Sequence, residues 1–162
     1  HDCELAIDPD TGHVEILAYR VVQDVGRALN PRAIHGQIQG GVMQGIGYAL
    51  HEEITLNDDC AFDQTGFESY LIPLASDAIP VEFDLYEGAP SCGPLGTKGA
   101  GEVPILNVGA TIACAVSDAT GKQVSKLPLT PPKIAALLDD RVEPLQHNHI
   151  SPLWTENTIR SS

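Results

Sequence analysis

Apolar and polar residues alternate along the first part of the chain. The alternation favours strands over residues 3–7 and 14–24, and the residues between them, Asp-Pro-Asp-Thr-Gly at 8–12, are typical of a tight turn. The pattern therefore predicts a hairpin whose second strand is the longer one. A third strand is expected over residues 81–86, after a mixed stretch that is typical of a loop with short extended pieces.

Three other stretches follow the helical period. Asn30 before Pro31 is typical of a helix start, and the apolar spacing continues to about residue 53. A second helix is expected over residues 104–120, with Gly121 as its end. Thr130, followed by two prolines, predicts a short last helix that ends near Leu138. These elements together predict an α+β fold, a mixed sheet with packed helices.

The composition bounds the size and the partners of this fold. With 162 residues, 43% of them hydrophobic, the chain is long enough for one domain with a real core. We expect that domain over residues 1–140, followed over residues 141–162 by a tail that is mobile or straps a partner. Nine basic and 22 acidic residues give a net charge of −13, which argues against nucleic acid and anionic membranes as partners.

The cysteines and the apolar runs point to a cytoplasmic, soluble protein. Cys3, Cys60, Cys92 and Cys114 lie far apart and form no CxxC pair, so we expect reduced thiols. Polar residues and glycines interrupt the apolar runs before the roughly 18 residues that a membrane-spanning helix needs. The first residues are neither an initiator methionine nor a signal sequence, so we expect the chain to begin inside a longer one.

Glycines concentrate in the first predicted helix. Residues 35–47 contain five of them, and each glycine costs about 1 kcal/mol relative to alanine inside a helix. One face of this helix is apolar, and another carries small residues and amides: Gln37, Gly40, Gly41, Gln44 and Gly47. Such a bare face admits either a flat ligand that the glutamines can hydrogen-bond or the backbone of a tightly crossing element. Composition alone favours the crossing element.

A second glycine-rich segment, residues 90–102, ends in a carboxylate. Its backbone N–H groups could hold an anionic oxygen, and Glu102 stands where the next helix begins. The phosphate-loop motif is absent because Gly99 follows Lys98, and Pro104 stands where a dinucleotide fingerprint needs a glycine. Glu102 is therefore a helix cap or a general base, and the local pattern favours the cap.

Four ordered segments together resemble one family. They are Asp24-Val25-Gly26-Arg27 with Asn30-Pro31, the glycine helix from Gly36-Gln37 to Gly47, Pro94-Leu95-Gly96-Thr97-Lys98-Gly99-Ala100-Gly101-Glu102, and Leu127-Pro128-Leu129-Thr130-Pro131. Over residues 7–138 they resemble the molybdenum hydroxylases, which include xanthine dehydrogenase, aldehyde oxidase and the carbon monoxide dehydrogenase large subunit. The resemblance implies a molybdenum cofactor-binding fold and the C-terminal part of the molybdopterin-binding large subunit.

The same resemblance implies roles for single residues. Glu102 corresponds to the glutamate that acts as general base when an aldehyde or N-heterocycle is hydroxylated with water-derived oxygen. Gln37 corresponds to the glutamine at the molybdopterin. The other implied cofactor-binding residues are Gly36, Gly40, Gly41, Lys98, Gly99, Ala100 and Gly101, and no residue is expected to ligate the metal itself. Lys98 could instead pair with a surface carboxylate.

The implied cofactor is molybdopterin, with or without an added nucleotide. Iron-sulfur and flavin groups are expected only on partner domains or subunits. The expected partners are the remaining part of the molybdenum subunit, the iron-sulfur and flavin subunits and a small-molecule substrate; a homo-oligomer stays open.

Two further hypotheses belong to other classes of protein. The chain could be a catalytically silent structural module that binds cofactor only with the rest of the large subunit. It could also expose a docking surface for that remainder, in which case the isolated chain is expected to self-associate.

Overall fold

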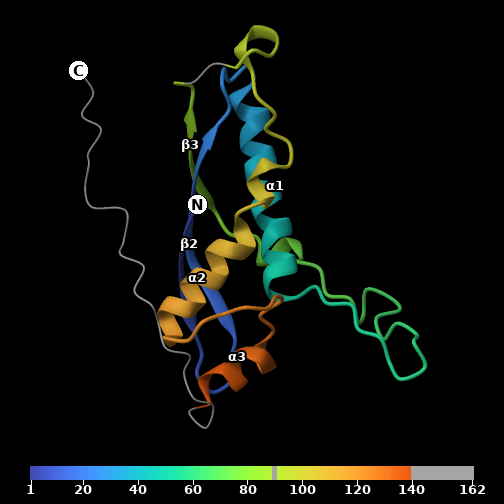
Figure 1. Cartoon of the computed structure of the whole chain (residues 1–162). Helices are drawn as coiled ribbons and strands as arrows, with labels where there is room; N and C mark the ends of the chain where they lie inside the picture. Colours follow the sequence, from blue (N-terminus) through green and yellow to red (C-terminus); the bar gives the residue numbers. More distant parts are fainter. Residues whose placement is uncertain (89–90, 140–162) are drawn as a thin grey trace.

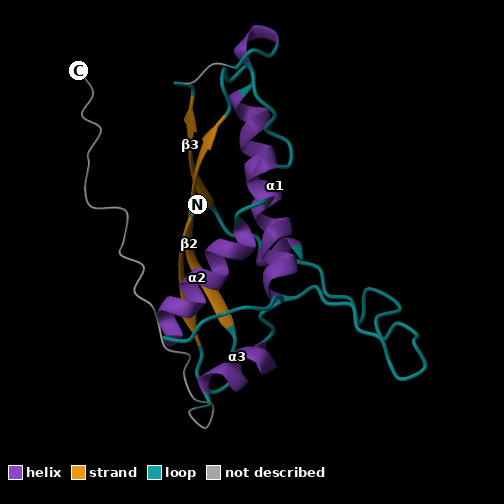
Figure 2. Cartoon of the chain, in the orientation of Figure 1, coloured by secondary structure: helices purple, strands orange, loops and turns teal. Residues whose placement is uncertain are grey.

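The computed structural model describes residues 1–88 and 91–139. The predicted tail, residues 141–162, lies outside the described residues. Strands form the back of the molecule and helices the front, and a long loop projects to one side (Figures 1 and 2). This arrangement confirms the predicted α+β fold with a mixed sheet and packed helices.

The sheet has the order β1-β2-β3. Strand β1 (Asp2–Ile7) pairs antiparallel with β2 (Val14–Asp24), and β2 pairs in parallel with β3 (Val81–Tyr86). The predicted hairpin is confirmed, and its turn is closed by a 2.8 Å hydrogen bond from the Gly12 N–H to the Asp8 carbonyl. Because β3 runs parallel to β2, the C-terminal ends of the two strands lie at the same edge of the sheet.

Helices cover one face of this sheet. The inward side chains of β2, among them Tyr19 and Val21, are buried, whereas Leu17 and Val22 on the opposite face are more than half exposed, at 54% and 67%. The core between the layers joins these residues to buried side chains of the helices α1, α2 and α3: Ile38, Val42, Ile46, Ala49, Leu50, Ile112, Val116 and Ile134. The apolar stripe predicted on the first helix is thus its core face.

Helix α1 (Pro31–Leu50) begins as predicted. The side-chain oxygen of Asn30 accepts a 3.0 Å hydrogen bond from the Ala33 N–H, and Pro31 takes the first helical position, where no N–H is needed. The helix ends at Leu50, slightly before the predicted residue 53. The N–H groups of His51 and Glu52 both turn back to the Gly47 carbonyl, at 2.8 and 2.9 Å.

The second predicted helix is two elements instead of one. A short 3-10 helix, η3 (Val103–Ile105), precedes helix α2 (Val108–Thr120), and Gly121 ends α2 with a φ of 68°. The Tyr48 hydroxyl of α1 bridges the two elements, since it donates to the Ile105 carbonyl at 2.9 Å and accepts from the Gly109 N–H at 3.1 Å. These bonds hold the joint between η3 and α2 against α1.

The same stretch corrects the expectation that no apolar run is long enough to cross a membrane. Residues Val103–Thr120 pass that test by length and composition, with a mean hydropathy of 1.3. In the structure, however, α2 has 13 residues and is therefore about 20 Å long, against about 30 Å for a bilayer core. The stretch packs against α1 and β1.

The last helix and the projecting loop complete the fold. Helix α3 (Pro131–Leu138) lies against the β1–β2 turn, where Gly12 contacts Pro131 and Ala135. Thr130 precedes it as predicted, although its side chain makes no capping hydrogen bond. Residues 54–74, called the arm below, project from the end of α1 (Figure 1). The arm is a loop with one short extended pairing, Leu56 with Phe62, as the sequence predicted.

Candidate functional site

The glycine-rich segment that leads to Glu102 is fastened to the end of β2. Gly26 and Thr97 form an antiparallel bridge, which is flanked by hydrogen bonds of 3.0 Å from the Lys98 N–H to the Val25 carbonyl and from the Arg27 N–H to the Gly96 carbonyl. Gly26 has a φ of 62°, and a side chain there would collide with Gly96 and Lys98. Glycine at position 26 is therefore what lets the segment approach the sheet.

An ion pair strengthens this attachment. The Lys98 Nζ lies 2.5 Å from Oδ2 of Asp24, and Oδ1 of Asp24 accepts from the Gly26 N–H at 2.9 Å. The hydrogen bond from Lys98, with that from Gly26, holds the pKa of Asp24 below its ordinary value. The alternative expected for Lys98, pairing with a surface carboxylate, is confirmed. A contact of Lys98 with cofactor stays a prediction.

From this attachment the segment runs along α1. Gly101 faces Gln37, because a Cβ at position 101 would lie 3.9 Å from the Oε1 of Gln37. Further along, Pro104 lies over Gly41, where a Cβ would come within 2.9 Å of the Pro104 Cβ. The Tyr48 hydroxyl then holds Ile105 and Gly109, as described above. The two glycine-rich segments of the sequence are thus neighbours in space.

The glycines of α1 divide into two groups. Gly41, Gly45 and Gly47 are buried, and added side chains there would meet Pro104, Val108, and Glu52 with Pro73, respectively. For these three the tightly crossing element is the correct interpretation of the bare face. Gly36 and Gly40, and Gly99 of the opposing segment, have no atom within 4 Å of an added Cβ.

Among the expected cofactor-binding glycines, Gly41 differs from the others. Pro104 and Ile105 fill the space that a Cβ at Gly41 would take, so the structure gives Gly41 a packing role, and its contact with cofactor stays a prediction. Gly36, Gly40 and Gly99 are exposed and leave room for a ligand, and Ala100, which follows Gly99 in the chain, is half-buried.

Glu102 does not act as the helix cap that the local pattern favoured. It occupies the position before η3, but only its backbone carbonyl takes part, accepting a 3.1 Å hydrogen bond from the Ile105 N–H. Within residues 1–88 and 91–139, the carboxylate of Glu102 and the amide of Gln37 have no hydrogen-bond or ion-pair partner, and both residues are exposed. Both side chains are free to meet a ligand.

Three features around the site escaped the sequence analysis. Tyr48 holds η3 and α2 against α1, Asp24 of the first family-like segment is the carboxylate that pairs with Lys98, and Gln23 is buried beside this end of β2. A tyrosine within a buried helix and an aspartate that ends a strand carry no local signal for partners far along the chain. The burial of Gln23 carried no such signal either, because a shift in the β1–β2 register brings the odd-numbered residues of β2 inward after the even-numbered Val14 and Ile16.

The described residues of the site can form hydrogen bonds with a ligand and supply one carboxylate, that of Glu102, as a base. Among the described residues no group of three or more His, Cys, Asp or Glu side chains could hold a metal ion. All four cysteines are free, and burial raises the pKa of Cys3 to about 11. The site therefore suits a flat ligand bound by amide and backbone groups, with a carboxylate close to it.

Comparison with known proteins extends this description. Residues 1–79 match the family described as molybdopterin cofactor-binding domain. The chain is 40% identical over 134 residues to the gamma subunit of the 6-hydroxypseudooxynicotine dehydrogenase complex of Paenarthrobacter nicotinovorans, covering 81% of the chain and 17% of the relative. It is 33% identical to the aldehyde oxidoreductase molybdenum-binding subunit PaoC of Escherichia coli (strain K12), covering 88% and 20%.

Solved structures show the same fold. Quinoline 2-oxidoreductase from Pseudomonas putida 86 superposes with a TM-score of 0.79 at 30% identity, over 85% of this chain and 18% of that one. Carbon monoxide dehydrogenase from Oligotropha carboxidovorans gives 0.78 at 27%, over 86% and 18%. The chain thus spans about a fifth or less of the length of each of these proteins.

Proposed function

The chain belongs to the xanthine dehydrogenase/aldehyde oxidase family of molybdenum hydroxylases, and we propose that it contributes a general base and a pterin contact to the active site of such an enzyme. Glu102 is the proposed base and Gln37 the proposed contact. The remaining part of the molybdenum-binding subunit would supply the rest of the site.

One observation carries this proposal: the free carboxylate of Glu102 directly follows Gly101, which faces the free amide of Gln37. An amide donates and accepts at once, as the edge of a pterin requires, and the open faces of Gly36, Gly40 and Gly99 leave room beside it. The residues present therefore fit a molybdopterin. When bound, that cofactor supplies the redox chemistry of the hydroxylation.

The chain's own part in the reaction is to hold and move one proton. A carboxylate oxygen of Glu102 accepts the proton that the attacking oxygen loses, and this carboxylate is not engaged by any described residue. Gly101 allows the backbone to pass close to Gln37, which places both groups along one side of α1. The ion pair of Lys98 with Asp24 fixes where the segment leaves the sheet.

The proposed reaction is hydroxylation of an aldehyde or an N-heterocycle with a water-derived oxygen. The names of the relatives include both kinds of substrate, an aldehyde for the E. coli protein and quinoline for the Pseudomonas enzyme. We propose a cytoplasmic enzyme that also carries iron-sulfur and flavin groups on other domains or subunits.

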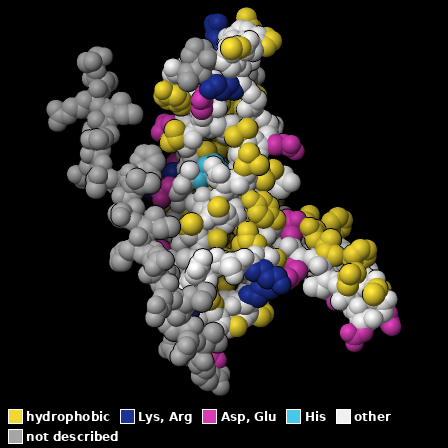
Figure 3. All heavy atoms as spheres, in the orientation of Figure 1, with side chains coloured by type: hydrophobic (Ala, Val, Ile, Leu, Met, Phe, Trp, Pro, Cys, Tyr) yellow, Lys and Arg dark blue, Asp and Glu magenta, His cyan; other side chains and the backbone are white. Residues whose placement is uncertain are grey.

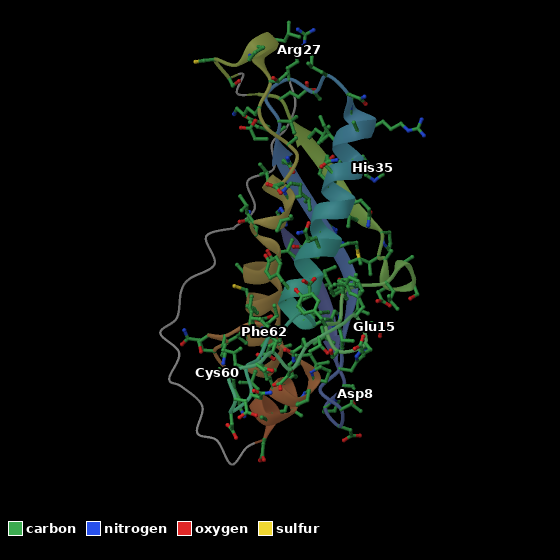
Figure 4. All side chains as sticks on the ribbon, turned by 90° about the vertical axis from the view of Figure 1, so that its right-hand side faces the viewer. Asp8, Glu15, Arg27, His35, Cys60 and Phe62 are labelled. Atoms are coloured by element: carbon green, nitrogen blue, oxygen red, sulfur yellow. The ribbon has the colours of Figure 1, made fainter. Side chains whose placement is uncertain are left out.

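Substitution of Glu102 tests the assigned role in the assembled enzyme. Glu102→Gln should lower turnover about 100-fold or more, because the amide cannot accept the proton, while the molybdenum content is unchanged. Glu15→Gln is the matched control, since Glu15 is an exposed carboxylate of β2 well away from Arg27 and the site end of the molecule (Figure 4). Turnover by Glu102→Gln at the rate of the control would contradict the role of base.

A silent structural module remains the second candidate for the isolated chain. It is favoured by the chain's small share of the length of its relatives, 17% for the gamma subunit of the dehydrogenase complex. Metal analysis of the isolated chain separates the two candidates. Stoichiometrically bound molybdenum would argue against a silent structural module. Its absence would support the interpretation that cofactor binding needs the rest of the subunit.

A further inference from the structure

The arm is an exposed apolar surface. Of the fourteen large hydrophobic side chains that are exposed in the described residues, seven belong to the arm: Ile54, Leu56, Phe62, Phe67, Leu71, Ile72 and Leu74. Phe67 is 78% exposed. Figure 3 shows groups of apolar side chains along the arm, and Cys60 and Phe62 are labelled in Figure 4, whose view faces the side to which the arm projects. An isolated domain rarely exposes apolar area on this scale unless something covers it.

The arm holds its shape through its own hydrogen bonds. The Thr55 hydroxyl donates a 2.7 Å hydrogen bond to Oδ2 of Asp63. The Thr55 N–H donates another, also of 2.7 Å, to Oε1 of Gln64. At the tip, the Asn57 side chain accepts from the N–H groups of Asp59 and Ala61, both at 3.0 Å. A preorganised loop loses less conformational entropy when it binds than a disordered one.

The base of the arm is fastened to α1 as well. The Tyr70 hydroxyl donates a 2.6 Å hydrogen bond to Glu52, a bond that raises the pKa of Tyr70, and Pro73 packs against Gly47. The apolar side chains are therefore presented by a loop fixed at both its base and its tip, and they do not fold back onto the body of the chain.

The negative charges of the arm indicate which kind of surface it can bind. The arm contains four acidic residues, Asp58, Asp59, Asp63 and Glu68, and no Lys or Arg occurs between Arg32 and Lys98. A second copy of the chain would bring the same negative charges and a net charge of −13, so two arms repel each other. This argues against the self-association expected from the sequence and favours an apolar surface with a basic rim.

We propose that the arm docks the chain onto the remaining part of the molybdenum-binding subunit, through an apolar surface on that part flanked by Lys or Arg. The relatives carry about four-fifths of their length outside the stretch that this chain matches, which leaves ample chain to cover the arm. This inference rests on the proposed function, because it assumes the same large subunit.

The test uses the gamma subunit of the 6-hydroxypseudooxynicotine dehydrogenase complex from P. nicotinovorans, without its matching stretch, as the binding probe. The tagged probe is co-expressed with the chain, and the chain that co-purifies is quantified. Phe62→Ser with Phe67→Ser should reduce co-purification about 10-fold or more, because both rings are exposed contact groups. Asp58→Lys with Asp59→Lys should also reduce it, and binding of the unchanged chain should weaken with added salt.

Matched controls separate the arm from the rest of the surface. Leu17→Ser with Val22→Ser removes two exposed apolar side chains from the open face of the sheet and should leave co-purification unchanged. Glu102→Gln should also co-purify as the unchanged chain does, so loss of the catalytic role and loss of docking are observed separately. The inference is overturned if the unchanged chain does not co-purify, if the arm variants bind as well as the control, or if the arm instead forms dimers of the chain.

Discussion

At the scale of single residues, Gln23 is a polar side chain buried among apolar ones. It lies between Val21 and Val25 on the inward side of β2 and is 4% exposed. Neither its Nε2 nor its Oε1 has a hydrogen-bond partner among the described residues. A buried amide without a partner destabilises the folded chain by about 1–3 kcal/mol relative to one that is satisfied.

Gln23→Met should therefore stabilise the isolated chain, by about 1 kcal/mol, because it removes a polar group that gains no hydrogen bond in the folded state. Gln39→Met is the matched control and should destabilise it. Gln39 donates to the Ile79 carbonyl at 2.7 Å and accepts from the Val81 N–H at 3.3 Å. Urea denaturation followed by circular dichroism measures both; a loss of stability in Gln23→Met would mean that its amide has a partner in solution.

At the scale of elements, the packing of α1 against η3 and α2 decides what its glycines do. A Cβ at position 45 would lie 2.6 Å from Cγ2 of Val108, whereas one at position 40 would meet nothing within 4 Å. The periodicity of the sequence places both glycines on α1 but does not show which of them another element covers. Substitution of glycine by alanine is therefore expected to change the stability of the chain in opposite directions at positions 40 and 45.

Gly40→Ala should stabilise the isolated chain by up to about 1 kcal/mol, because alanine is the better helix former and has space here. Gly45→Ala should destabilise it by about 1–3 kcal/mol, since Val108 and α2 must move away from α1. Thermal unfolding of the two variants beside the unchanged chain gives the comparison. Equal shifts in the same direction would show that α2 does not cross α1 at Gly45.

At the scale of the whole molecule, charge is the dominant feature. Nine basic and 22 acidic residues leave a net charge of −13, and this charge destabilises the compact state by self-repulsion. The described ion pairs offset little of it, because Arg20, Lys98 and Lys133 pair with carboxylates at or near the surface, where each pair contributes about 0–1 kcal/mol.

Salt should therefore raise the Tm of the isolated chain. Between about 10 mM and about 300 mM NaCl, screening shortens the range of the repulsion from about 30 Å to less than about 10 Å. Asp58→Lys with Asp59→Lys exchanges two negative charges for two positive ones, and its Tm should respond less to salt. Differential scanning calorimetry over a salt series measures both, and a Tm that falls with added NaCl would contradict this account.

The sequence by itself determined the features that depend on neighbours along the chain. The hairpin and its turn, the Asn30 and Pro31 start of α1, and the left-handed Gly121 that ends α2 all follow from local backbone and capping preferences. The order of its motifs also predicted the family, and it singled out Glu102 and Gln37 before any contact between their elements was known.

Only the tertiary structure decided the features that depend on contacts between distant residues. The Tyr48 hydroxyl bridges the two elements into which one predicted helix divides, Pro104 packs against Gly41, and Asp24 pairs with Lys98. A periodic pattern shows which side chains share a face of an element, but not which other element lies against that face. The physical reason is that packing and ion pairing act through space, whereas capping and turn preferences act along the chain.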